Sequence, residues 1–107
     1  MTDRSLFRRA PAHHCHVNEH VLDDAAHLIV WSVRRAIDFD DPTELQEGPA
    51  WLAGRLAGSP LGPDVVRVAL REAVRELESD EEYARALTLA ARFAAETEAR
   101  LRRTAAA

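Results

Sequence analysis

Residues 79–103, SDEEYARALTLAARFAAETEARLRR, decide the fold class of this chain. Within them, apolar or small side chains recur at alternating steps of four and three residues, which is the spacing of a coiled-coil seam. The seam comprises Tyr83, Leu87, Ala90, Ala94, Thr97 and Leu101, with Ala86, Leu89 and Phe93 beside it. An acidic start and an arginine-rich end complement the helix dipole. The pattern predicts a helix from Asp80 to Arg103, begun by a capping box of Ser79 and Glu82.

A second long helix is predicted near the N-terminus. Asn18 is the predicted N-cap of this helix, because its side chain can accept a hydrogen bond in the first turn. Apolar residues then recur at three- and four-residue spacing as far as Ile37. Further apolar residues widen this face, so we expect the helix to be buried on two sides. Its residues 27–33, HLIVWSV, are also typical of a β-strand, and this is the main competing interpretation of the fold.

Two shorter helices are predicted between these. The first begins with Asp41 as N-cap and Pro42 in the first turn, but the Gly48-Pro49 pair should interrupt it, so that residues 49–57 carry it. The stiff sequence SPLGP at 59–63 follows as a corner. The next helix then begins near Pro63 and ends near Ser79.

The sequence thus predicts an all-α protein, a small helical bundle of about four helices with a long C-terminal helix and a flexible N-terminal arm. With 107 residues, 47% of them apolar, the chain fits one domain. We expect a flexible arm over 1–16, a single all-α domain over 17–104 and a disordered tail over 105–107. The longest charge-free run of the body, 25–33, is too short to cross a membrane, and no signal peptide is apparent, so we expect a cytoplasmic protein. The richness in Arg, Ala and Leu suggests a bacterial, GC-rich genome.

The composition removes most enzyme classes. All 14 basic residues are arginine, so lysine chemistry and the phosphate-binding loop lysine are excluded. The single cysteine, Cys15, rules out an internal disulfide and a four-cysteine zinc site, and its own role stays open. No serine lies in a nucleophile elbow. We therefore expect no catalytic residue and no bound cofactor, although the chain could serve as the non-catalytic subunit of an enzyme complex.

Histidines gather near the N-terminus, at His13, His14, His16, His20 and His27. If the first helix extends back by one turn, His16, His20, Asp23 and His27 share one face, a geometry that suits zinc. No histidine follows position 27, so the other helices could supply only carboxylates. The alternative is a polar stripe on a buried helix, with the remaining histidines in the arm.

Residues 51–77, WLAGRLAGSPLGPDVVRVALREAVREL, resemble the helix-turn-helix of bacterial regulators. That resemblance implies a second helix in the major groove, with Arg55, Arg67, Arg71 and Arg75 facing phosphates or base edges. The turn is longer and stiffer than is usual in that motif, and Glu72 and Glu76 lie on the helix that would approach DNA. The alternative is an ordinary helical hairpin with solvated arginines.

The function that we predict from these observations is association. The chain is expected to be a non-catalytic accessory or regulatory subunit, or an adaptor, that forms a homodimer and binds a larger protein partner through helix packing. The predicted contact residues are Trp31, Trp51, Tyr83, Leu87, Ala90, Phe93, Ala94 and Leu101. The tryptophans are candidate anchors because this residue type dominates interface energetics, but for Trp51 burial in the chain's own core is the commoner outcome. A dimeric DNA-binding regulator is the first alternative, and a zinc-type sensor is the second.

Overall fold

The computed structural model describes residues 12–106, which form four helices and no strand. These are α2 (Ala12–Asp38), α3 (Thr43–Leu56), α4 (Gly62–Leu77) and α5 (Tyr83–Ala106). The prediction of a small all-α bundle with a long C-terminal helix is confirmed. The predicted arm falls partly on residues 1–11, which lie outside the described part of the chain.

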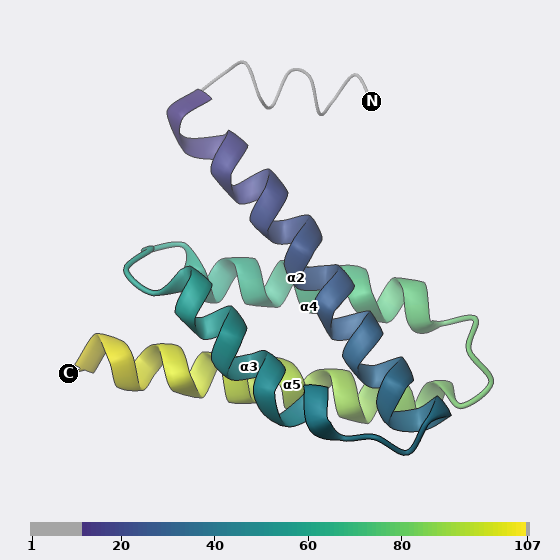
Figure 1. Cartoon of the computed structure of the whole chain (residues 1–107). Helices are drawn as coiled ribbons and strands as arrows, with labels where there is room; N and C mark the ends of the chain where they lie inside the picture. Colours follow the sequence, from purple (N-terminus) through teal and green to yellow (C-terminus); the bar gives the residue numbers. More distant parts are fainter. Residues whose placement is uncertain (1–11, 107) are drawn as a thin grey trace.

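The helices form two layers. Figure 1 shows α2 and α3 crossing in front of α4 and α5. Each front helix packs on a rear helix, α2 on α4 and α3 on α5, and the two helices within each layer also pack together. The described residues extend 42 × 39 × 16 Å, so the molecule is a thin slab with one internal layer of side chains.

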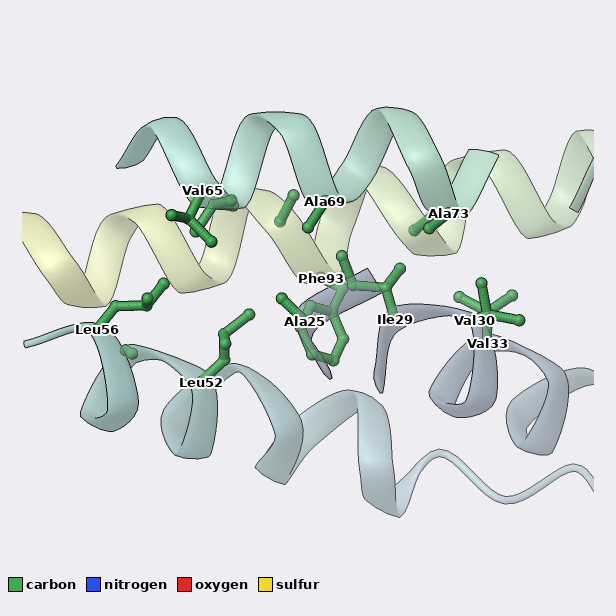
Figure 2. Close-up of a cluster of buried hydrophobic side chains, with 14 of the residues drawn as sticks. Ala25, Ile29, Val30, Val33, Leu52, Leu56, Val65, Ala69, Ala73 and Phe93 are labelled. Atoms are coloured by element: carbon green, nitrogen blue, oxygen red, sulfur yellow. The ribbon is translucent and has the colours of Figure 1, made fainter. Parts of the chain in front are cut away.

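The core lies between the two layers and receives side chains from all four helices (Figure 2). Phe93 is its largest fully buried side chain. Much of the remaining buried set is alanine, at positions 25, 36, 53, 69, 73, 86, 90 and 94. Because alanine has a short side chain, these positions let the helix backbones approach closely, and a thin core results.

The strand-prone stretch 27–33 is helical. Ile29 and Val33 are fully buried and Val30 nearly so, on the side of α2 that packs against the rear layer. Burial of these branched side chains on one helical face outweighs their weak intrinsic preference for strands.

The start of α2 and the end of α5 differ from the predictions. Helix α2 begins at Ala12, so Asn18 lies inside the helix, and the last five residues of the predicted arm are helical. No proline or glycine stands between Pro11 and Asn18 to stop the helix. At the other end, α5 includes Ala105 and Ala106 of the predicted tail, because alanine is the strongest helix former.

Helix α3 is continuous through Pro49, where the sequence predicted an interruption. It starts at Thr43, whose backbone N–H donates to the Asp41 carboxylate at 3.1 Å, so the predicted start signal is close to correct. Proline inside a helix loses one backbone hydrogen bond. Here Pro49 is fully buried, and the packing that it gains in the core compensates for that bond.

The capping box predicted at the start of α5 is wrong. The helix starts at Tyr83, while Ser79 and Asp80 belong to the preceding turn. The Asp80 carboxylate instead accepts two hydrogen bonds from Arg34 of α2, at 2.9 and 3.0 Å. A contact with another helix therefore takes the place of the local cap, and it fixes the α4–α5 turn against α2.

Candidate functional site

The two tryptophans of the chain lie on its surface. Trp31 is 47% exposed and Trp51 is 51% exposed, so the expectation that Trp51 is buried in the core is wrong. They line the same groove between α2 and α3, with a volume of about 530 Å³. The groove is lined by Asp24, His27, Leu28, Trp31, Glu44, Glu47, Gly48 and Trp51.

The lining residues follow the same spacing on both helices. On α2 they occupy positions i, i+3, i+4 and i+7 from Asp24 to Trp31, and on α3 the same positions from Glu44 to Trp51. This spacing places four residues on one face of a helix. Each set begins with a carboxylate and ends with a tryptophan.

The helices α2 and α3 run in opposite directions, because a connection of only four residues joins them and Asp24 lies 4.0 Å from Arg55. The carboxylate of one helix therefore lies at the same end of the groove as the tryptophan of the other. One end pairs Trp31 with Glu44, and the other pairs Trp51 with Asp24. Each end of the groove thus has one carboxylate and one tryptophan.

Arginines of the same chain lie over both tryptophan rings. The guanidinium carbon of Arg35 is 5.4 Å from the ring centre of Trp31 and also 5.4 Å from that of Phe39. Arg55 lies over Trp51 at 5.3 Å. These are cation–π distances. Each ring thus already has a guanidinium group of the same chain over it, and each remains about half-exposed.

The groove carries unpaired negative charge. Asp24 faces Arg55 at 4.0 Å, whereas Glu44 and Glu47 have no cation within 4.0 Å among the described side chains. His27 donates through Nδ1 to the backbone oxygen of Asp23 at 3.0 Å. Two open carboxylates beside two exposed aromatic rings favour a ligand that is both cationic and apolar.

Gly48 joins the groove to the core. A Cβ atom at this position would lie 2.6 Å from Cε2 of Phe93, which is a steric overlap with a fully buried ring. Glycine therefore lets α3 approach α5 closely, and this contact fixes the wall that carries Glu44, Glu47 and Trp51.

The predicted contact residues of α5 are mostly internal. Ala90, Phe93, Ala94 and Leu101 are at most 8% exposed and belong to the chain's own core. They cannot contact a partner in the folded chain, so their predicted interface role is corrected to a core role. Of the six, Leu87 alone is exposed, at 38%, and Tyr83 is half-buried. A seam of small residues has the same pattern whether its partner helix belongs to the same chain or to another.

The predicted metal ligands do not form a described site. In the part of the chain that the structure describes, no group of three His, Cys, Asp or Glu residues is placed to hold a metal ion. His20 and His27 are exposed, and the side chain of His16 lies outside the described side chains. Zinc binding therefore stays a prediction.

The four arginines of the DNA-binding alternative are divided between two surfaces. Arg55 lies over the Trp51 ring beside the groove, while Arg67, Arg71 and Arg75 lie together on the outer face of α4. Arg67 contacts Asp64 at 3.1 Å and Glu98 at 3.8 Å. The helices α3 and α4 pack on α2 and α5 and are not a packed pair themselves, which differs from a helix-turn-helix. DNA binding stays a prediction.

The chain matches no protein-family model, and it shows no significant similarity to a curated protein or to a solved structure. Across residues 12–106, none of the helices combines the length and the apolar character that a membrane span requires.

Proposed function

We propose that the protein is a non-catalytic interaction module, which acts as a small accessory or regulatory subunit or as an adaptor. The observation that carries this proposal is the pair of half-exposed tryptophans, Trp31 and Trp51, in one groove. Tryptophan is enriched among the residues that dominate binding energy at protein interfaces. Covering both rings would remove a large apolar area from water.

The partner that this groove favours is a different protein. In a two-fold homodimer through the groove the same patch meets itself, so the carboxylates Asp24, Glu44 and Glu47 of both copies would be brought into one interface. Like charges brought together in this way weaken an interface. Homodimerisation, which the sequence suggested through α5, would have to use another surface, since most of that seam is internal.

Affinity capture with the full-length chain, from a lysate of the source cells, tests the proposal. The wild type is compared with a Trp31→Ala/Trp51→Ala variant and with Leu61→Ala, which changes an exposed apolar residue outside the groove. Circular dichroism checks that all three proteins are folded. We expect a stoichiometric protein that survives nuclease, is retained by Leu61→Ala and is lost with the double variant.

Two results would overturn the proposal. One is that the wild type retains no protein in stoichiometric amount. The other is that the double variant retains the same protein as the wild type. Recovery of a defined DNA segment without a protein would instead favour the arginines of α4 as the functional surface.

A further inference from the structure

Helix α3 has the least favourable helical sequence of the four helices. Its 14 residues include Gly48, Pro49 and Gly54, whereas α2 and α5 contain neither glycine nor proline, and in α4 these residue types occupy only the first turn. Glycine and proline have the lowest helix propensity, and Pro49 supplies no N–H to the carbonyl of Leu45 one turn earlier. Helix α3 therefore depends on its packing against α2 and α5.

The contact between α3 and α2 leaves a buried polar group without a partner. Ser32 of α2 is fully buried, and its Oγ atom has no hydrogen-bond partner among the described residues. Gly48 of α3 lies against it, since a Cβ atom built at Gly48 would be 3.6 Å from that oxygen. A hydroxyl that loses water and gains no hydrogen bond destabilises the state in which it is buried. Separation of α3 from α2 would return this hydroxyl to water.

Polar contacts contribute little to holding α3 in place. Among the described side chains, its only ion pair with another helix joins Arg55 to Asp24 at 4.0 Å, and both side chains are about half-exposed. Near the start of α3, Arg35 of α2 donates to Asp41 of the connecting link at 3.2 Å. Exposed ion pairs add little to stability. Apolar packing is therefore the main attachment of α3.

The other three helices contact one another without α3. Helix α2 packs on α4, α4 packs on α5, and α2 also contacts α5. The two hydrogen bonds from Arg34 of α2 to Asp80 fix the α4–α5 turn and do not involve α3. Figure 1 shows α3 at the front of the bundle, joined to the rest by a loop at each end. Departure of α3 breaks none of the contacts among α2, α4 and α5.

We infer that α3 separates from α2 and α5 as one unit, while α2, α4 and α5 stay packed. The opening exposes the buried side chains of Leu52, Leu56 and Phe93, so the open form is a minor population of the folded protein. The groove wall that carries Trp51 moves away from Trp31 with α3, so the groove is complete only in the closed form. This consequence for binding rests on the proposed function, whereas the opening is a property of the free chain.

Native-state hydrogen exchange of the full-length protein, resolved by peptide mass spectrometry, tests the inference. Exchange is measured at increasing urea concentrations below the unfolding transition. We expect the amides of residues 50–56 to be at least about tenfold less protected than those of residues 86–97 in α5. Their protection should also depend less on urea, because a local opening exposes less surface than global unfolding does. Equal protection and equal urea dependence in both segments would overturn the inference, since α3 would then open only when the whole chain unfolds.

The variant Ser32→Ala tests the physical cause of the opening, because it removes the unpaired hydroxyl from the closed form. We expect it to raise the protection of residues 50–56 about tenfold. The matched control is Thr97→Val. Thr97 is also fully buried, but its hydroxyl donates to the Phe93 carbonyl at 2.9 Å within α5. That hydrogen bond is kept when α3 leaves, so Thr97→Val should leave the protection of α3 unchanged.

Two results from these variants would overturn the inference. Unchanged protection of α3 in Ser32→Ala would show that its amides exchange without separation from α2. An equal rise in both variants would show a general stabilisation of the core.

The capture experiment separates this inference from the proposed function. If α3 is as protected as α5 and the tryptophan-dependent partner is still captured, the opening is wrong while the interaction module stands. If α3 opens as expected and the wild type captures nothing, the opening stands and the proposed function fails.

Discussion

The buried face of α5 and the open groove between α2 and α3 differ in which side chains they carry and in how far these are exposed. The face of α5 surrounds a single large ring, Phe93, with alanines, and it is closed to solvent. The groove displays the two largest side chains of the chain, Trp31 and Trp51, each about half-exposed. The described residues form a slab only 16 Å thick, whose single internal layer combines alanines with Phe93, leucine, isoleucine and valine, while both tryptophans remain at the surface. The side chains that stabilise the fold and those of the proposed binding groove therefore lie on different faces of the helices.

The strongest test of this division compares Phe93→Ala with Trp31→Ala. Removing the buried ring should lower the free energy of unfolding by about 3–5 kcal/mol, because a cavity forms in the core. Removing the larger but half-exposed indole should lower it by less than about 1 kcal/mol. Urea denaturation followed by circular dichroism measures both values. Equal losses in the two variants would show that the groove belongs to the core after all.

The next effect concerns Gly48, where the groove and the core meet. Gly48→Ala places a methyl group 2.6 Å from the fully buried Phe93 ring, so we expect a loss of about 1–3 kcal/mol through overpacking. Gly54 provides the matched control in the same helix. An added Cβ there meets nothing within 4 Å, and Gly54→Ala should raise stability by about 0.5–1 kcal/mol through helix propensity.

Thermal or urea denaturation of these two variants tests the role of Gly48 with one chemical change in one helix. If both substitutions stabilise the protein, α3 does not need its close approach to α5. The wall of the groove would then have no support from Phe93.

The regular spacing of apolar residues was enough to predict most of the fold. The seam of α5 and the apolar face of α2 are long, and a long periodic pattern identifies a helix even where single residues favour a strand. The ends were less predictable, because they depend on contacts made across the molecule. The α4–α5 turn, for example, is held by two hydrogen bonds from Arg34 of α2 to Asp80, and α5 begins only at Tyr83.

The sequence did not predict the groove because of one local signal in α3. Trp31 and Trp51 were both candidate anchors, but Gly48-Pro49 indicated a break in the helix between Glu44 and Trp51. With that break, the repeated i, i+3, i+4, i+7 spacing on α3 disappears, and Glu44 and Glu47 belong to a linker. The buried packing of Pro49 and Gly48 keeps α3 continuous, and no local propensity reports such packing.

The smallest effect that we predict comes from the ion pair between Arg34 and Asp80, which joins the helix of Trp31 to the turn before α5. The two hydrogen bonds from Arg34 hold the pKa of the Asp80 carboxyl below its ordinary value. A lowered folded-state pKa stabilises the protein above the unfolded pKa of about 4, and this contribution is lost as the pH falls through the folded value. Both side chains are partly exposed, so the pair should contribute less than about 1 kcal/mol at pH 7.

Asp80→Asn should therefore be slightly less stable than the wild type at pH 7 and at pH 5, and the difference should vanish as the pH falls below the folded-state pKa. Urea denaturation at several pH values measures this difference. Glu81→Gln is the control, because it removes an exposed neighbouring carboxylate that has no ion-pair partner among the described side chains. A constant difference between Asp80→Asn and the wild type at every pH would show that Asp80 acts through its shape in the turn and not through its charge. Packing alone would then hold α2 against the turn before α5.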